Sequence, residues 1–228
     1  MMHAEERQLV IPGQLIAEGD YKLGKGVFQD GDKIRSSVMG LVDKRGKKIR
    51  TIPLEGSYVP KSGDKVLGIV VDDYYAGWML DIGAPYQGNL SVSSLKQRKV
   101  DLKKEDISKF LAAGDIVEAK IQDVDELMNI KLEVTDDEKG RISGGRLIEI
   151  SPSKIPRVIG RKGSMISILQ KVGECDLSIG QNGRVMIWGD SKKRINRVVE
   201  AILKIEREAH TSGLTDRIRK FLENEKGG

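Results

Sequence analysis

The sequence predicts a multidomain protein that is mainly β in its first part and α+β in its last part. Short apolar strands separated by glycine-rich turns fill residues 1–139, and longer amphipathic stretches with helical spacing follow them. A length of 228 residues suits one large domain or two to three small ones. The changes of pattern favour three modules, at residues 1–60, 61–139 and 140–228.

The first module is expected to be a small all-β domain. It contains VIPGQLIAEGDYKLGKGVF and KIRSSVMGLVDKRGKKIRTIPLEGSYVP, in which strand-length pieces are separated by Gly-Asp, Gly-Lys and Arg-Gly-Lys turns. No catalytic residue pattern is visible in this part of the sequence.

The second module is expected to be a five-stranded OB barrel. Its five apolar pieces are GDKVLGIVVDD, AGWMLDIG, GNLSVSSL, GDIVEAKIQDVD and NIKLEV, with a long connection between the third and the fourth. Trp78 alternates in phase with Leu80 and Ile82, which favours a place in the barrel core. The long connection carries a basic loop, for which phosphate binding and simple solvation are equally good explanations; its cations are Lys96, Arg98 and Lys99.

The third module is expected to have the order β-α-α-β-β-α. A strand, RLIEI, precedes a short helix at residues 153–159, and a second helix covers residues 164–172. CDLSIG and RVMIWG form a hairpin around the Gln181-Asn182-Gly183 turn, and we interpret that turn as a turn only. A long amphipathic helix starts at Asp190 or Ser191, and a short helix follows near the end.

The most informative stretch is IPRVIGRKGSMISIL, in which Gly160 and Gly163 interrupt a helical pattern. A glycine inside a helix costs about 1 kcal/mol relative to alanine, so a turn between two helices explains them better. Such a turn lets a nucleic-acid backbone approach, and the amides that start the second helix meet its phosphates. The predicted RNA-binding residues here are Lys154, Arg157, Ile159, Gly160, Arg161, Lys162 and Gly163. The apolar flanks expected to line a groove for bases are Val158, Ile159, Ile166, Leu177 and Ile179.

The charge is distributed unevenly along the chain. Residues 1–139 have a net charge of −3 and residues 140–228 a net charge of +8. A polyanionic partner explains this excess, and a solvated basic face explains it about as well.

The composition disfavours catalysis and points to the cytoplasm. Cys175 is the only cysteine, and His3 and His210 are the only histidines, so no disulfide, cysteine-based zinc site or histidine pair is expected. We therefore expect no catalytic residues, metal or cofactor. No apolar run approaches the roughly 20 residues that span a bilayer, and the start lacks the layout of a secretion signal. We expect a cytoplasmic protein that contacts no membrane.

The last module resembles a KH domain, because VIGRKGSMI lies between two helices in the required order. That resemblance implies a GXXG loop that clamps about four nucleotides of single-stranded RNA or DNA. The middle module resembles the OB module of the ribosomal S-one type. By position, Tyr74 or Tyr75 supplies a stacking ring and Asp125 the acidic residue, whereas Met79 and Ser91 replace a usual aromatic and a usual histidine.

The order of the modules resembles the ribosomal RNA-processing protein four family, the KH-bearing cap subunits of the archaeal exosome. IPGQLIAEG and LGKGVF in the first module add to this resemblance. It implies a non-catalytic role, in which three copies cap a hexameric ring of phosphorolytic ribonuclease subunits. The resemblance also implies that the caps guide the 3′ end of single-stranded RNA inward for degradation or tailing, and we expect the first module to dock on the ring.

Two other protein classes use similar modules. A ribosome- or translation-associated RNA-binding factor is the alternative, although such a factor would not need the first module. Polynucleotide phosphorylase has the modules in the order KH then OB, behind large catalytic domains that this sequence lacks.

Overall fold

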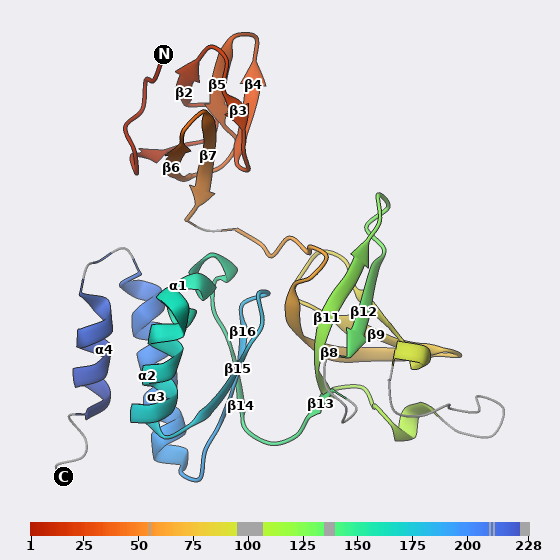
Figure 1. The fold of residues 1–228 in the computed structure, drawn as a ribbon. Coiled ribbons are helices and arrows are strands. Elements are labelled where there is room, and N and C mark those ends of the chain that lie inside the picture. Colours follow the sequence, from red (N-terminus) through yellow and green to blue (C-terminus); the bar gives the residue numbers. More distant parts are fainter. Residues whose placement is uncertain (55, 95–106, 135–139, 210, 212, 224–228) are drawn as a thin grey trace. The chain divides into compact units, whose positions relative to one another are not determined.

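The chain folds into two compact units, residues 1–56 and residues 57–228 (Figure 1). The structure is a computed structural model, and it describes residues 1–54, 56–94, 107–134, 140–209, 211 and 213–223. Within those residues, none of the helices combines the length and the hydropathy that crossing a bilayer requires.

The first unit is built from two small sheets. One has the strand order β1-β6-β7-β3 and the other the order β2-β5-β4. The strands are β1 (Leu9–Val10), β2 (Leu15–Glu18), β3 (Lys22–Leu23), β4 (Val27–Asp30), β5 (Lys33–Ser36), β6 (Gly40–Arg45) and β7 (Lys48–Pro53). The buried core of the unit consists of Ala4, Val10, Ile16, Ala17, Ile34, Val42 and Ile49. The expected all-β character of this part is confirmed.

The LGKGVF stretch needs its glycines because it runs close against β7. A Cβ on Gly24 would lie 2.6 Å from the Cβ of Arg50, and one on Gly26 would lie 2.5 Å from the carbonyl oxygen of Thr51. Any side chain at either position would therefore push β7 away.

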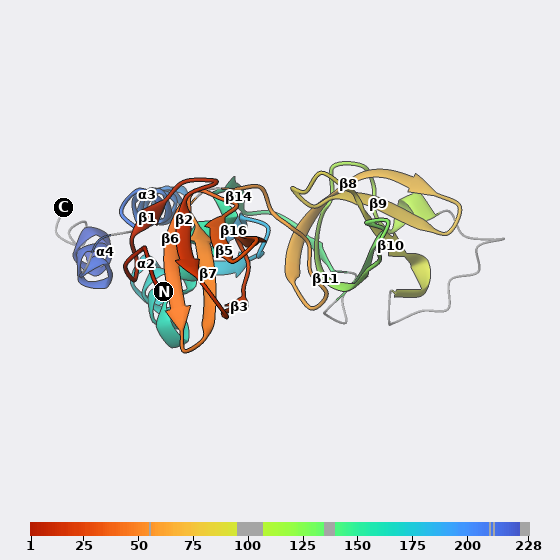
Figure 2. The same ribbon diagram turned by 90° about the horizontal axis from the view of Figure 1, so that it is seen from above.

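The second unit begins with the predicted five-stranded barrel. Its elements are β8 (Lys65–Tyr74), β9 (Gly77–Asp81), β10 (Gly88–Ser91), the 3-10 helices η1 (Val92–Ser94) and η2 (Ile107–Lys109), β11 (Ile116–Val124) and β12 (Ile130–Val134). The sheet order is β12-β10-β9-β8-β11-β13, with β13 (Arg141–Ile142) at the edge. An added pairing of β12 with β11 closes the barrel, and Figure 2 shows β8, β9, β10 and β11 curving around its interior.

Trp78 lies in the barrel core, as its position in the alternation predicts. It is fully buried, and its indole Nε1–H donates to the carbonyl oxygen of Leu111 at 3.0 Å. Leu111 follows η2 on the long connection, so this hydrogen bond attaches the connection to the barrel. Burying the ring removes a large apolar surface from water, and the hydrogen bond satisfies its single polar atom.

The rest of the second unit has the predicted β-α-α-β-β-α order. Its elements are β14 (Arg146–Glu149), η3 (Pro152–Lys154), α1 (Ile155–Ile159), η4 (Arg161–Gly163), α2 (Ser164–Gly173), β15 (Asp176–Ile179), β16 (Arg184–Trp188), α3 (Lys192–Arg207) and α4 (Leu214–Glu223). The strands pair in the order β14-β16-β15, and α2 and α3 pack against β15 and β16 (Figure 1). The last helix, α4, packs on α2 and α3 and buries Leu214, Ile218 and Leu222.

Candidate nucleic-acid interface

The two glycines predicted to break the helical pattern form a tight corner between α1 and α2. We call residues 160–163 the GXXG corner. Gly160 ends α1 with φ 76°, and its N–H donates to the carbonyl oxygen of Pro156 at 3.0 Å. Lys162 and Gly163 then adopt left-handed backbone angles, with φ 53° and φ 77°. Such angles reverse the chain direction within one turn, which is why the helix pattern stops here.

The two glycines play different parts, although the sequence gives no sign of it. A Cβ on Gly160 would lie 2.6 Å from the backbone nitrogen and 2.7 Å from the Cβ of Met165. A Cβ on Gly163 would meet only the Ile166 side chain, at 3.7 Å. Gly160 is therefore needed to pack the corner, and the open space that a nucleotide backbone could enter lies beside Gly163.

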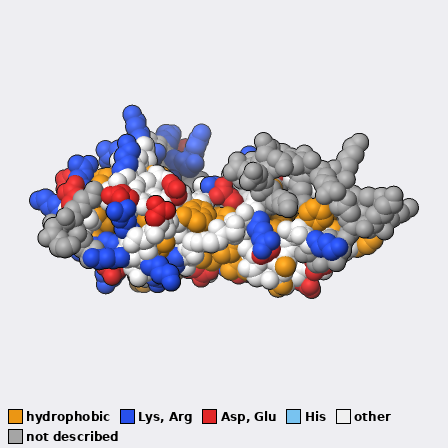
Figure 3. All heavy atoms as spheres, turned by 90° about the horizontal axis from the view of Figure 1, so that it is seen from below, with side chains coloured by type: hydrophobic (Ala, Val, Ile, Leu, Met, Phe, Trp, Pro, Cys, Tyr) orange, Lys and Arg blue, Asp and Glu red, His pale blue; other side chains and the backbone are white. Residues whose placement is uncertain are grey.

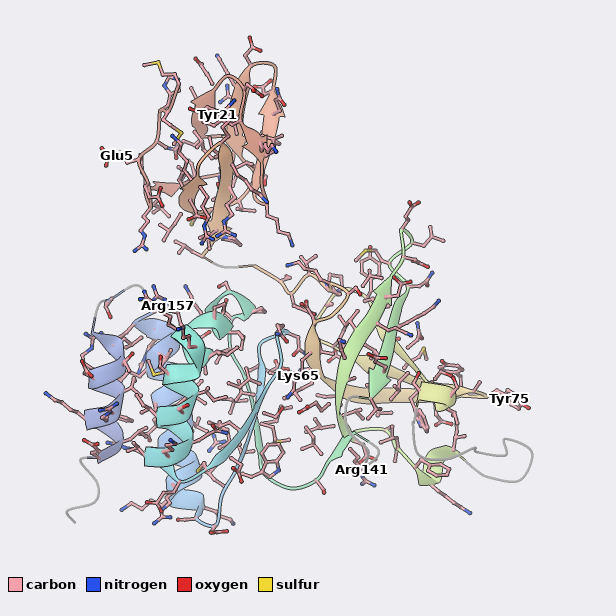
Figure 4. The ribbon with its side chains drawn as sticks, in the orientation of Figure 1. Glu5, Tyr21, Lys65, Tyr75, Arg141 and Arg157 are labelled. Carbon is pink, nitrogen blue, oxygen red and sulfur yellow. The ribbon has the colours of Figure 1, made fainter. Side chains whose placement is uncertain are left out.

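Positive charge surrounds this opening. Arg157, Arg161 and Lys162 are exposed and Lys154 is half-buried, and within the described part of the chain no acidic side chain forms an ion pair with any of them. Arg157 extends from α1 (Figure 4). Figure 3 shows Lys and Arg side chains over the part of the molecule where the KH helices lie, with acidic side chains among them. Cations that no protein carboxylate neutralises are suited to bind a polyanion.

The start of α2 adds a partial positive charge to the same opening. Gly163 occupies the N-cap position, and no side chain caps this end of the ten-residue helix. The Ser164 N–H already donates to the Arg161 carbonyl oxygen, and the partial positive charge of the helix end favours an anion beside it.

Part of the apolar groove expected beside the corner is instead core. Val158 is fully buried and Ile179 is 8% exposed, so neither presents a surface to a base. Their side chains fill the space between the helices and the sheet. Ile159, Ile166 and Leu177 are half-buried and pack against this core, so they are the apolar flanks that remain accessible.

The two barrel tyrosines lie far from the corner. Tyr74 ends β8, and Tyr75 follows in the β8–β9 turn with 77% of its surface exposed. Tyr75 points outward at the tip of that hairpin, on the side of the barrel away from Arg157 (Figure 4). The hydroxyl oxygen of Tyr74 would lie 2.8 Å from a Cβ at Gly77, so its ring folds back over the hairpin. The structure therefore separates the predicted site residues into two groups.

Asp125 shapes a turn between β11 and β12. Its carboxylate accepts hydrogen bonds from the backbone N–H groups of Leu127 and Asn129 and from the Asn129 amide. The side-chain and backbone hydrogen bonds from Asn129 hold the pKa of Asp125 below its ordinary value, so the carboxylate is ionised over a wide range of pH.

Three predicted residues, Lys96, Arg98 and Lys99, lie outside the described residues. Sequence reasoning missed Tyr86, an exposed ring between β9 and β10, because one aromatic in a polar loop carries no periodic signal. In the part of the chain that the structure describes, no three His, Cys, Asp or Glu side chains are grouped so that they could hold a metal ion.

A second basic region lies at the other end of α2. A cleft of about 470 Å³ is lined there by Lys193, Arg194 and Arg197. Arg194 is paired with Glu174, and Arg197 stacks 3.5 Å above the Phe221 ring centre. Two of its three cations are therefore already bound by the protein, unlike those at the GXXG corner.

Models of three protein families match consecutive parts of the chain. Residues 7–55 match the N-terminal domain of the exosome RNA binding protein RRP4, residues 59–135 match the S1 RNA binding domain and residues 145–204 match the KH domain. Among curated proteins, the exosome complex component Rrp4 of Methanothermus fervidus is 46% identical over 222 residues, which cover 97% of this chain and 98% of the relative. The chain belongs to the Rrp4 family.

Other relatives agree with this assignment. The exosome complex component Rrp4 of Pyrococcus horikoshii is 45% identical over 220 residues, covering 96% of this chain and 83% of the relative. A crystal structure described as an exosome complex RNA-binding protein superposes with a TM-score of 0.69 at 38% identity, over 75% of this chain and 98% of that one. The predicted family, with its S1 and KH modules, is confirmed.

Proposed function

We propose that this Rrp4-family chain is a non-catalytic RNA-binding subunit of an archaeal exosome. It binds single-stranded RNA and guides the 3′ end into a ring of six phosphorolytic ribonuclease subunits, for degradation and tailing. The observation that carries this proposal is the GXXG corner, where exposed cations surround the open space beside Gly163.

RNA contact is assigned to both modules of the second unit. In the KH module the contacts are Lys154, Arg157, Ile159, Gly160, Arg161, Lys162 and Gly163. In the S1 module they are Tyr74, Tyr75, Lys96, Arg98 and Lys99. Phosphate contacts at the corner supply most of the affinity, and stacking on the exposed Tyr75 ring adds about 1–3 kcal/mol per base.

Docking on the ring is assigned to the module at residues 1–60. An apolar row on the outer side of its larger sheet supports this part of the proposal. Leu9 pairs with Leu41 across β1 and β6, and Leu41 pairs with Ile52 across β6 and β7, so the three side chains share one side of the sheet. Leu9 is 53% and Ile52 is 44% exposed. An exposed row of this kind is suited to bind a protein partner.

The proposal has further parts that rest on the family resemblance. Three copies cap one ring in the cytoplasm, and the chain needs no cofactor. The modules at residues 61–139 and 140–228 are the RNA-binding part. Hydrogen bonds between these two modules connect them within one compact unit.

The test is a pull-down of the tagged chain from a native lysate, followed by an assay for RNA degradation. We expect the ring subunits to be recovered and degradation to require inorganic phosphate. Recovery of ribosomal subunits without phosphate-dependent degradation would overturn the proposal in favour of a ribosome- or translation-associated factor.

A further inference from the structure

One edge of β8 is left open by the barrel itself. Residues 65–69 of β8 pair with β11, whereas pairing with β9 starts only at Ile69. Val70 exchanges hydrogen bonds with the segment that leads into β11, so the backbone groups of Leu67 and Lys65 point the other way. Without a partner, the N–H and C=O groups of Leu67 would stay unsatisfied in a buried position, which is unfavourable.

The β15–β16 turn of the KH module fills this edge. The Gln181 N–H donates to the Lys65 carbonyl oxygen at 2.7 Å, and the Gln181 Oε1 accepts from the Lys65 N–H at 2.9 Å. The Asn182 amide does the same for Leu67, with its Nδ2 2.9 Å from the carbonyl oxygen and its Oδ1 3.3 Å from the nitrogen. Its Nδ2 also donates to the Ile82 carbonyl oxygen at 3.0 Å. The turn thus substitutes for a missing strand.

A glycine permits this close approach. A Cβ on Gly180 would lie 2.9 Å from the Leu67 nitrogen and 3.3 Å from the Val66 Cα. The turn that the sequence predicts as a hairpin connection only is therefore also a contact between modules. Lys65, beside this turn, is labelled in Figure 4.

Arg184, at the start of β16, makes the strongest polar contact of this joint. Its side chain is 5% exposed. Nε donates to Glu149 of the neighbouring KH strand at 2.7 Å, which holds the guanidinium in position. Toward the barrel, Nη2 donates to the Asp81 carboxylate at 2.5 Å and Nη1 to the Asp81 carbonyl oxygen at 2.6 Å. An arginine bonded to both modules restrains distance and angle together.

A second bridge lies beside the first. The Ser178 hydroxyl of β15 donates to the Glu118 carboxylate of β11 at 2.5 Å. Glu118 in turn pairs with Lys65 at 2.7 Å between Oε1 and Nζ. With Asp81 in β9, the joint is therefore supported at three strands of the barrel, β8, β9 and β11, which resists both bending and twisting.

We propose that Asn182 and Arg184 are positioning residues that lock the KH module onto the open edge of β8. We call the contacts of these two residues with the barrel the lock. The lock keeps the GXXG corner and the Tyr75 tip at a fixed separation, so one RNA strand binds both without the entropic cost of fixing the two modules relative to each other. This inference rests on the proposed function and assigns the distance between its two RNA contacts to a small set of side chains.

The first test measures the separation directly in the full chain. Spin labels are placed on Glu126→Cys and Lys192→Cys, two exposed positions in the S1 and KH modules, in a Cys175→Ala background. We expect a narrow distance distribution that broadens with Arg184→Met or Asn182→Ala. Arg146→Met is the matched control, because Arg146 lies in the same sheet and bonds to Asn196 within the KH module. A distribution that stays narrow in both test variants overturns the lock.

The second test compares RNA lengths. A short single-stranded RNA reaches only one contact, and a series of longer ones reaches both. We expect Arg184→Met to weaken binding of the long RNAs by roughly three- to tenfold and to leave the short RNA unchanged, because only the second contact depends on preorganisation. Arg146→Met should change neither. An unchanged long-RNA affinity with a broadened distance distribution overturns the role in RNA spacing.

A variant on the barrel side of the joint tests whether the effects of Arg184→Met arise from misfolding of the KH module. Asp81→Asn removes the charge that faces Arg184 without changing a residue of the KH sheet. Like Arg184→Met, it should broaden the distance distribution and weaken the binding of long RNAs. If the unmodified chain binds neither RNA length, the proposed function fails, and the distance measurement still decides whether the lock exists. The two failures are therefore distinguishable.

Discussion

The guanidinium Nη2 of Arg184 lies 2.5 Å from the carboxylate Oδ2 of Asp81, and the two residues belong to different modules. Their environments are unequal, since the arginine side chain is 5% exposed and the aspartate side chain 44% exposed. Removing the acid therefore leaves a buried cation with one carboxylate fewer, whereas removing the arginine leaves a carboxylate that water can solvate. This asymmetry determines how the joint responds to mutation and to acid.

Acid should weaken the joint through Asp81. Partial burial alone would raise the pKa of Asp81, but hydrogen bonds from Arg184 and the Gly83 amide, with the guanidinium charge, hold it below the ordinary value of 3.8. Because the pKa of Asp81 is lower in the folded state than in the unfolded state, the ion pair stabilises the fold fully at pH values above the unfolded-state pKa. This stabilisation is lost as the pH falls through the folded-state pKa. We expect the free energy of unfolding of wild type to exceed that of Asp81→Asn near neutral pH, and the difference to shrink below about pH 4.

Urea unfolding at a series of pH values checks this expectation. Asp216→Asn, at an exposed acid in the first turn of α4, serves as a comparison at a distance from the joint. A wild-type advantage over Asp81→Asn that did not change between neutral and acidic pH would contradict the assigned role of the ion pair.

Charge at the GXXG corner should control RNA affinity. The double substitution Arg161→Asp and Lys162→Asp removes two exposed cations and places anions where phosphates are expected. We expect single-stranded RNA binding to weaken by about tenfold or more, and the slope of log affinity against log salt to decrease by about 1–2. Filter binding at several salt concentrations measures both quantities.

A matched control reverses two charges elsewhere in the same module. Lys192→Asp and Lys193→Asp change exposed lysines in the first turn of α3, at the other end of α2 from the corner. Acidic residues are favourable at a helix start, so this variant should fold. Equal losses of RNA affinity in the two variants would show a diffuse charge effect and no site at the corner.

The two glycines of the corner should respond differently to alanine. Gly163→Ala meets open space and is disfavoured mainly by its left-handed backbone, at about 1–2 kcal/mol. Gly160 has φ 76° and ψ 172°, a conformation essentially restricted to glycine, and a Cβ there would also lie 2.6 Å from the Met165 nitrogen. We therefore expect Gly160→Ala to lower the free energy of unfolding by about 1–3 kcal/mol more than Gly163→Ala does. Urea denaturation ranks the two variants, and equal losses would contradict the packing assigned to Gly160.

Local patterns predicted most of the fold. The alternation that places Trp78 inward repeats every two residues along one strand, and the break at Gly160 and Gly163 occurs within one turn, so short windows of sequence contain the whole signal. The buried state of Val158 and Ile179 was not predicted. A half-apolar helix and a hairpin strand look the same whether their apolar side chains face a core or an open groove.

The joint between the modules was beyond sequence reasoning for a different reason. Asn182 bonds to Leu67, which lies 115 positions earlier, and no local pattern records a contact over that separation. Asn-Gly is also the usual chemistry of a hairpin turn, so Asn182 and Gly183 already had a sufficient explanation. The signal that could have been noticed is Arg184, a charged residue at the start of an otherwise apolar strand.

The Tyr75 ring should contribute to RNA binding and little to stability. It is 77% exposed, so Tyr75→Ala should leave the free energy of unfolding unchanged within about 0.5 kcal/mol. Loss of one stacked base should weaken RNA binding by about 1–3 kcal/mol. Fluorescence titration with labelled RNA, alongside urea denaturation, measures both effects.

Trp78→Phe provides the opposite control within the same module. Removing the buried indole breaks the hydrogen bond to Leu111 and leaves unfilled volume, so stability should fall by about 1–3 kcal/mol. RNA affinity should stay as in wild type under conditions in which both proteins are folded. If Tyr75→Ala left RNA affinity intact, base stacking at the barrel tip would be ruled out.

Docking on the ring should depend on the apolar row of the first unit. Leu9→Glu with Ile52→Glu places two charges on the exposed side chains that flank Leu41, while the core residues Val10 and Val42 face the other side of the sheet. Desolvating a charge in an apolar interface is unfavourable, so we expect recovery of ring subunits by the tagged full chain to fall at least tenfold.

The double variant should otherwise behave as wild type. Both substituted side chains are about half exposed and lie outside the core of the unit, so its thermal unfolding should change little. Its affinity for single-stranded RNA should be unaltered because the proposed contacts for RNA lie in the second unit. Lys33→Glu, on β5 of the other sheet, is the control for added negative charge in the same unit. Undiminished recovery of the ring by Leu9→Glu with Ile52→Glu would place the docking surface elsewhere, because a buried apolar contact could not accept both carboxylates.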